Sequence, residues 1–245
     1  MPVRSSAHLV LDRLRRRIAR LFGRPPRQAI PTPEPPSSRR HPHMDFPALT
    51  SADLLEAKLF ATRQELVAAL GIPRRGIIAE VGVGLGDFSH YLIEALDPAQ
   101  FIAIDIFEMH KSPQNWGRLS TEIFGSLTHE EFYRARLQAS QDRVLICRGF
   151  SHEMLRGFPD GHFDLVYVDA GHDYASVAND AAISALKLKP HGVLLFNDYT
   201  MFDVDAMPYG VVPAVNELVR AGGWKVIGFA LEHHMYCDIA LRKIT

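Results

Sequence analysis

Polar residues that could bind a metal ion and move a proton follow two apolar segments in the second half of the chain. Asp169 ends the apolar run 163–168, and Asn197 and Asp198 end the run 192–196. If these runs are neighbouring parallel strands, the three side chains converge at the carboxyl edge of one sheet. Two carboxylates and an amide oxygen are hard ligands that suit Mg²⁺. The alternative is that Asp169 and Asp198 only cap the turns that follow them, as Asp often does.

A histidine stands beside this predicted metal site. His172 lies three residues after Asp169, where the chain enters a predicted helix over 174–186. A metal ion lowers the pKa of a hydroxyl bound to it, and a nearby imidazole can then take the proton as a general base. His172 and Asp169 are therefore the candidate catalytic residues. His172 could instead be a helix-start residue that hydrogen-bonds only to the backbone.

A glycine turn in the first half of the folded part indicates a cofactor site. An apolar run over 77–81 leads into the turn, a helical pattern follows, and a second apolar run ends on an acid, which together predict a βαβ unit. Glycines let the backbone approach a ligand closely, and a carboxylate at the end of the second strand can accept hydrogen bonds from ribose hydroxyls. The candidate cofactor residues here are Glu80, Gly82, Gly84, Gly86 and Asp105. A turn that only packs the helix on the strand is the alternative, because such motifs give false positives.

The spacing of the glycines distinguishes between two kinds of cofactor. The turn has the pattern G-x-G-x-G, whereas a dinucleotide turn has G-x-G-x-x-G. With Glu80 before it and Asp105 after it, the turn resembles the first motif of class I S-adenosylmethionine-dependent methyltransferases. The resemblance implies S-adenosylmethionine as the cofactor. It also implies that the turn Gly149, Phe150 and Ser151 lies beside the adenine ring.

Later motifs are similar to one branch of that family. Asp169, His172 and Tyr174 in the pattern D-x-x-H-x-Y, the sequence L-K-P-x-G over 188–192, and N-D-Y over 197–199 resemble small-molecule O-methyltransferases of the macrolide-sugar and catechol types. The resemblance implies Mg²⁺ held by Asp169, Asn197 and Asp198, with His172 as the base. This chain has Asn-Asp where those relatives have Glu-Asp or Asp-Asn, so its metal site departs from theirs in the order of the two residues.

The order of apolar runs predicts an α/β fold, a doubly wound, mostly parallel seven-stranded sheet with a C-terminal antiparallel hairpin. Runs 224–230 and 235–241 form that hairpin, with Glu232, His233 and His234 in its turn. A helix is expected from residue 51 to Leu70. The segment 107–141 is too long for an ordinary connection, so it is predicted to be a lid or substrate wall, or else a packed insertion.

The N-terminal segment differs in composition from the rest. Residues 1–44 hold ten Arg, no Lys and two acids, a charge of +8; the whole chain carries −1, which leaves −9 for residues 45–245. Over residues 7–24, apolar residues recur at helical spacing and arginines form a second stripe. This pattern predicts a basic amphipathic helix that contacts an anionic membrane or a partner. A disordered tail and an Arg-rich transit peptide are alternatives. Prolines over 25–42 predict a stiff linker, and residues 45–245 form the predicted methyltransferase domain.

The remaining composition narrows the function classes. The negative charge of the folded part argues against nucleic-acid binding. Two isolated cysteines indicate a reducing compartment, and no apolar run reaches the roughly 18 residues of a membrane span, so we predict a cytoplasmic protein, with peripheral membrane contact through 7–24. The predicted function is metal-assisted O-methylation of a small hydroxylated molecule such as a sugar, polyketide or phenol. The alternatives are a nicotinamide-dependent oxidoreductase and a non-catalytic, membrane-attached binding module on the same fold.

Overall fold

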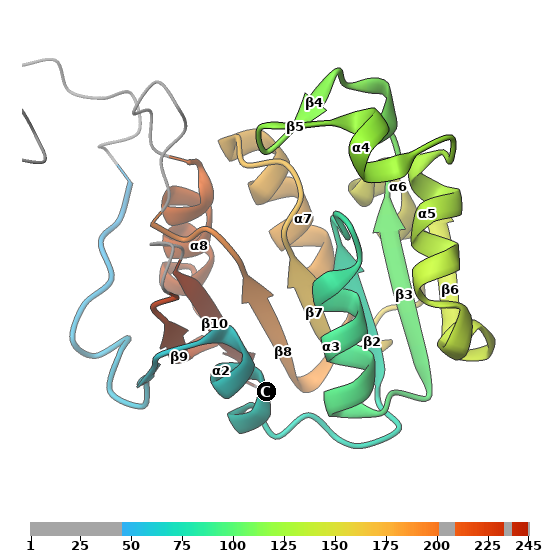
Figure 1. The fold of residues 1–245 in the computed structure, drawn as a ribbon. Coiled ribbons are helices and arrows are strands. Elements are labelled where there is room, and N and C mark those ends of the chain that lie inside the picture. The colour runs from blue at the N-terminus through green and yellow to red at the C-terminus, as the bar shows by residue number, and fades with distance from the viewer. Residues whose placement is uncertain (1–45, 201–208, 233–236, 245) are drawn as a thin grey trace, which may run out of the picture. The chain divides into compact units, whose positions relative to one another are not determined.

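The computed structural model describes residues 46–200, 209–232 and 237–244, and its centre is one eight-stranded sheet (Figure 1). The strand order is β1-β9-β10-β8-β7-β2-β3-β6. β10 is antiparallel to both of its neighbours, and every other pairing in this sheet is parallel. Its strands are β1 (Lys58–Phe60), β2 (Ile77–Val81), β3 (Gln100–Asp105), β6 (Val144–Arg148), β7 (Phe163–Val168), β8 (Leu188–Phe196), β9 (Trp224–Ala230) and β10 (Asp238–Lys243).

Helices cover both faces of this sheet, and each face has its own apolar core. Leu66, Leu92 and Tyr133 bring α2, α3 and α5 into one buried cluster, while Leu155 and Val177 belong to the cluster on the other face, with α6, α7 and α8. The helices are α2 (Arg63–Ala69), α3 (Asp87–Leu96), α4 (Ser120–Phe124), α5 (His129–Arg136), α6 (Ser151–Arg156), α7 (Tyr174–Lys187) and α8 (Val211–Arg220). The predicted doubly wound α/β fold is therefore confirmed, and so is the terminal antiparallel pair β9–β10.

The eighth strand and the first helix correct two expectations. The sequence predicted one helix from residue 51 to Leu70, but the chain makes turns over 51–56, pairs β1 with β9, and begins α2 only at Arg63. Thr62 and Glu65 form a capping box that starts the helix there. Leu55 and Leu59, expected on the buried side of the helix, are 82% and 66% exposed. The apolar spacing was thus misleading, because only the last two turns of the pattern face the core.

The insertion between β3 and β6 is an ordered substructure. It contains η1 (Met109–Lys111), the hairpin β4 (Gln114–Asn115) and β5 (Arg118–Leu119), α4, α5 and η2 (Gln138–Arg143). The predicted capping box of Thr128 and Glu131 is present at the start of α5. Figure 1 shows the β4–β5 hairpin and α4 lying beyond the carboxyl ends of the central strands. Whether this insertion acts as a lid stays a prediction.

The leader 1–44, its boundary, and His233 and His234 lie outside the described residues. In the parts of the chain that are described, no helix is long and apolar enough to cross a membrane.

Candidate cofactor and metal site

The residues that follow the central strands are tied to one another across the carboxyl edge of the sheet. Asp169 N–H donates to Val81 O at 2.8 Å, and Asn197 N–H donates to Val168 O at 3.0 Å. On the other side, Gly149 N–H donates to Asp105 O at 2.9 Å. Strand pairing thus continues one residue past each strand end. The predicted convergence of these segments at a single edge follows from the parallel register.

The three glycines of the turn differ in what a Cβ at each position would contact. A Cβ at Gly82 would lie 2.0 Å from Asp169 O, and one at Gly86 would lie 3.0 Å from the Tyr133 ring. A Cβ at Gly84 would meet nothing closer than Trp116 Cη2 at 3.9 Å. Gly82 and Gly86 are therefore required by the protein itself. Gly84, at φ +49°, borders open space, which is where a ligand could approach the backbone.

Asp105 is held rigidly beside this turn. Its Oδ2 accepts a hydrogen bond from Val83 N–H at 3.0 Å, and its Oδ1 accepts one from Phe107 N–H at 2.6 Å. Each carboxylate oxygen keeps a second lone pair. The side chain is therefore fixed at the end of β3 and able to accept hydrogen bonds from a ligand, as the ribose prediction requires.

The Glu80 side chain is buried and bonded to Ser89, so its effect on a cofactor would be less direct than the sequence suggested. Its side chain is 1% exposed and accepts a hydrogen bond from Ser89 Oγ, which in turn accepts one from Tyr133 O–H at 2.9 Å. Burial raises the pKa of Glu80 well above its usual range, although the bond from Ser89 lowers it. In this arrangement Glu80 would affect a cofactor through α3, which carries Ser89 immediately after the glycine turn.

The turn that is predicted to lie beside the adenine ring is held by a hydrogen bond to α7. Ser151 Oγ donates to Asp180 Oδ1 on α7 at 2.6 Å. Asp180 is 1% exposed, and its burial raises its pKa. The Phe150 ring is 61% exposed, so it is accessible to a planar ligand. A role for Gly149, Phe150 and Ser151 at the adenine ring stays a prediction.

Asp169, His172 and Asp198 form the one group of possible metal ligands found among the described residues. One ligand atom from each lies within 4.8 Å of the others. Nε2 of His172 is 3.1 Å from Asp198 Oδ2 and 3.7 Å from Asp169 Oδ1. Nε2 has no hydrogen-bond partner among the described residues, so these two contacts are ion pairs without hydrogen-bond alignment.

The unpartnered acceptors of this cluster fit a bound cation. Oδ1 of Asp198 and Oδ1 of Asn197 are buried with no hydrogen-bond partner in the described part of the chain. Buried oxygens without donors are costly, and a divalent cation would satisfy them. The donor set fits such an ion: the carboxylates and the amide suit Mg²⁺, and an imidazole nitrogen would also suit Mn²⁺ or Fe²⁺. The structure thus places His172 within ligand range, a role that the sequence did not assign to it.

The charge state of His172 depends on the two aspartates. Burial lowers its pKa, but Asp169 and Asp198 outweigh burial and raise the pKa to about 9. Without a cation, the ring is therefore protonated at neutral pH. Because the folded pKa lies above the ordinary value of 6.5, this ion pair contributes its full stability below about pH 6.5 and loses it as the pH rises through about 9. Neutralising the carboxylates with a cation would lower the pKa again and free the ring to accept a proton.

Two further features fix the cluster. Asp198 has φ +55°, a left-handed conformation that Asp tolerates better than most residues but that still costs energy. The His172 ring stacks on Tyr209, with centroids 4.3 Å apart and planes 4° apart. Tyr209 was not singled out from the sequence, since it is far from His172 along the chain and only folding brings the rings together.

Sequence reasoning also missed a buried polar group beside the cluster. Arg63 Nη1 donates to Tyr167 O–H at 3.1 Å, and its guanidinium lies 4.1 Å from the centroid of the Phe88 ring. Asp238, at the start of β10, is fully buried, and neither carboxylate oxygen has a hydrogen-bond partner among the residues that the structure describes. Burial raises the pKa of Asp238 well above its usual range, while Arg63 lowers it. These residues come from separate elements, so no spacing signal could have revealed them.

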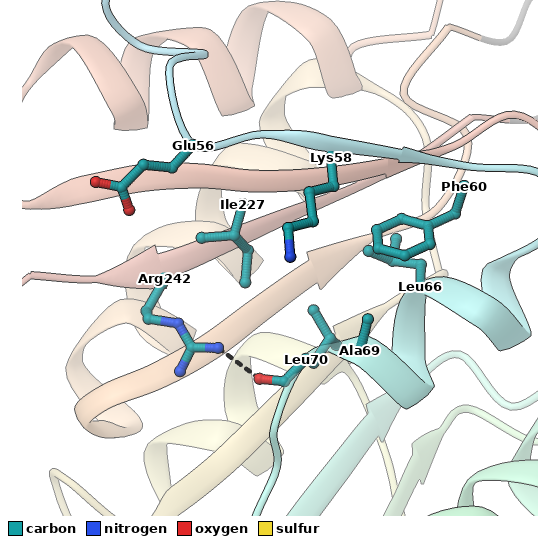
Figure 2. Close-up of a pocket in the computed structure, with 8 residues that line it drawn as sticks. All are labelled: Glu56, Lys58, Phe60, Leu66, Ala69, Leu70, Ile227 and Arg242. Atoms are coloured by element: carbon teal, nitrogen blue, oxygen red, sulfur yellow. Dashed lines mark hydrogen bonds between the residues drawn. The ribbon is translucent and has the colours of Figure 1, made fainter.

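A separate cavity of about 140 Å³ lies between α2 and strands β1, β9 and β10 (Figure 2). Its lining includes Glu56, Lys58 and Arg242, and none of the candidate site residues. Figure 2 shows the Arg242 guanidinium bound to the Leu70 carbonyl, and it also donates to His191 O at 3.2 Å. The residues that line this cavity give no reason to place the active site there.

Comparison with known families identifies the central part of the chain. Residues 79–199, from the strand before the glycine turn to the residue after Asp198, match a family model described as "Methyltransferase domain". This segment is similar to methyltransferase domains. It contains both the glycine turn and the Asp169–His172–Asp198 cluster. None of the curated proteins compared with the chain matches it significantly.

Solved structures of methyltransferases share the fold of this chain. A precorrin-6y C5,15-methyltransferase from Geobacter metallireducens is 17% identical, with a TM-score of 0.50, over 74% of this chain and 86% of that one. A SAM-dependent methyltransferase from Aquifex aeolicus is 13% identical, with a TM-score of 0.51, over 80% and 94%. An O-methyltransferase family protein from Burkholderia thailandensis is 16% identical, with a TM-score of 0.52, over 75% of this chain and 55% of that one. These structures confirm the predicted fold, and the family model matches the segment in which the methyltransferase motifs were predicted.

Proposed function

We propose that the chain is a metal-assisted O-methyltransferase that transfers the methyl group of S-adenosylmethionine to a small hydroxylated molecule. The observation that carries this proposal is the direct contact between the predicted cofactor turn and the predicted metal cluster. Gly82 of the cofactor turn packs directly against the backbone of Asp169, where a Cβ would lie 2.0 Å from the carbonyl oxygen. An acidic cluster with a histidine therefore adjoins the turn where the methyl donor would bind.

The residues of this cluster can carry out the reaction in a defined order. Asp169, Asn197 and Asp198 would hold the cation, which when bound lowers the pKa of an acceptor hydroxyl. His172, freed from its ion pairs, accepts the hydroxyl proton at Nε2. With S-adenosylmethionine held by the glycine turn and Asp105, the acceptor oxygen would attack the methyl carbon, the carbon–sulfur bond would break, and S-adenosylhomocysteine would depart with the bonding electron pair. Rate acceleration comes from holding oxygen, carbon and sulfur in line and from deprotonation.

The alternatives make less use of the same features. A nicotinamide-dependent oxidoreductase would need a dinucleotide turn, and the G-x-G-x-G spacing differs from it. A non-catalytic binding module would have no use for buried acceptor oxygens beside an imidazole, which cost stability when unpaired.

We expect the purified protein to bind S-adenosylhomocysteine and not NADH in calorimetry. We also expect it to methylate one or more members of a panel of sugars, polyketides and phenols when S-adenosylmethionine and Mg²⁺ are present, with products detected by mass spectrometry. EDTA should stop the reaction and added Mg²⁺ or Mn²⁺ should restore it. Full turnover in EDTA would remove the metal from the proposal, and binding of NADH alone would support the oxidoreductase.

We further propose that residues 7–24 attach the protein to an anionic membrane surface. The net charge of +8 is confined to residues 1–44, and the apolar residues among the arginines recur at helical spacing, as in interfacial helices. The acidic remainder of the chain would be repelled by such a surface, so the leader alone would supply the attraction.

Replacing four leader arginines in the full chain, Arg13, Arg16, Arg17 and Arg20, by Gln should weaken binding to vesicles containing phosphatidylserine by more than tenfold. Each basic residue near such a surface contributes about 1 kcal/mol. Vesicle co-sedimentation measures the effect, vesicles of phosphatidylcholine alone serve as the control, and turnover with a water-soluble acceptor should not change. Equal sedimentation of both proteins with anionic vesicles would refute membrane attachment.

A further inference from the structure

We propose that His129, on the insertion, is a positioning residue that holds the glycine turn in the conformation that binds the cofactor. The inference rests on the proposed cofactor site but concerns a residue outside it. His129 is the first residue of α5 and is fully buried. Its Nε2 lies 2.6 Å from Gly84 O, in the middle of the turn. Because a carbonyl oxygen can only accept a hydrogen bond, Nε2 must carry the hydrogen.

This hydrogen bond acts on the most adaptable part of the turn. Gly84 lies at φ +49° beside open space, and a glycine can adopt many other backbone conformations. Holding its carbonyl toward α5 fixes the plane of the peptide that joins it to Leu85. In a trans peptide the N–H points opposite to the C=O, so the Leu85 N–H is directed away from His129. The bond therefore determines which backbone groups the turn presents to a ligand.

The insertion contacts the proposed cofactor residues at two more points. Phe107, whose N–H donates to Asp105, packs its ring 5.1 Å from that of His129. Tyr133 O–H donates to Ser89 Oγ, the partner of Glu80. Phe107 is a bulky, fully buried residue at φ +53°, a strained conformation that the surrounding packing must maintain. One aromatic cluster thus supports the glycine turn, Asp105 and Glu80 together.

Packing alone does not explain a histidine at this position. The His129 ring packs against Phe107 and Phe124, and Phe107 in turn packs against Tyr133. Nδ1 of His129 is buried with no hydrogen-bond partner among the described residues. A phenylalanine would fill an aromatic cage without the cost of an unpaired nitrogen. The feature that a phenylalanine could not supply is the hydrogen bond to Gly84.

Two substitutions separate this hydrogen bond from packing. His129→Phe keeps a ring and removes the donor, whereas His129→Gln places an amide N–H near the position of Nε2. We expect His129→Phe to weaken S-adenosylhomocysteine binding about tenfold in calorimetry, the factor that corresponds to one hydrogen bond, without a fall in Tm. Amide exchange at Gly86 N–H, which donates to Val83 O at 2.9 Å, should become faster. His129→Gln should stay within about twofold of the wild type in both measurements.

Arg136→Gln is the matched control on the same helix. It removes the exposed ion pair of Arg136 with Asp87, which contributes little, and should change neither affinity nor exchange. If His129→Phe does not fold, His129→Asn, whose shorter amide cannot reach Gly84 O, takes its place with the same expectation. Wild-type affinity and exchange in a folded donor-free variant would overturn the inference. A wild-type protein that does not bind S-adenosylhomocysteine would overturn the proposed function instead, and the exchange measurement would still decide the role of His129.

Discussion

Asp169→Ala and Asp198→Ala are each expected to abolish methyl transfer while leaving the Kd for S-adenosylmethionine within about threefold of the wild-type value. Each substitution removes a carboxylate from the cluster in which ligand atoms lie within 4.8 Å of one another. The cofactor contacts would instead come from the glycine turn and Asp105. Asp169 meets that turn through its backbone carbonyl, which alanine keeps. Turnover and calorimetry on the same preparations measure the two effects separately.

His172→Ala should behave differently from the aspartate variants. We expect it to bind cofactor normally and to lose about 10²–10⁴-fold in rate, the usual effect of removing a positioned general base. The loss should shrink as the pH rises, because the acceptor hydroxyl then ionises without help. If His172 is instead a fourth metal ligand, the loss should shrink when the Mg²⁺ concentration is raised, and the pH profile should keep its shape.

Asp173→Ala is the matched control for these variants. Asp173 is the N-cap of α7 and accepts a hydrogen bond from Ser176 N–H, so its loss should destabilise the protein by about 1 kcal/mol. It should nevertheless retain turnover, since it does not belong to the cluster. Normal turnover in Asp198→Ala would show that the acidic cluster is not catalytic.

Gly84→Val is expected to abolish binding of S-adenosylmethionine while the protein remains folded. The added side chain would enter the space beside Gly84, where the nearest atom of the described residues is Trp116 Cη2, 3.9 Å from the Cβ position. Trp116 is 72% exposed and can move aside, so the protein accommodates the added volume, whereas a ligand bound at the turn would compete with it. Calorimetry measures the affinity, and circular dichroism with thermal unfolding checks the fold.

The backbone strain of this substitution needs its own control. Gly161→Val provides it, because Gly161 also lies at positive φ, +64°, with no atom within 4 Å of its Cβ position, and it is not part of the candidate site. Both variants should lose about 1–2 kcal/mol of stability from the left-handed conformation, but only Gly84→Val should lose the cofactor. Unchanged affinity in a folded Gly84→Val protein would place the cofactor elsewhere.

Local sequence patterns predicted most of the sheet, but the prediction failed over residues 51–70, where a helical pattern of leucines overlaps an edge strand. The apolar runs at 77–81 and 163–168 became β2 and β7 with the expected bounds, because a strand buried on both faces consists almost wholly of apolar residues. Residues 51–70 carried leucines at helical spacing, yet Lys58–Phe60 became an edge strand. A strand at that position depends on β9 being available as a partner about 170 residues later, and a short window of sequence contains no information about that partner.

The sequence by itself determined that Asp105, Asp169 and Asn197–Asp198 would meet near a glycine turn. In a parallel sheet all strand ends of one kind lie at one edge, so identifying the strands was enough to place these residues together. Only the tertiary structure decided how they interact. It set His172 between two carboxylates that raise its pKa to about 9, buried Glu80 behind Ser89, and brought His129 from the insertion onto Gly84 O. Those outcomes depend on side-chain packing between elements far apart in the chain, and pKa values and hydrogen-bond partners are set by the three-dimensional surroundings rather than by neighbours in sequence.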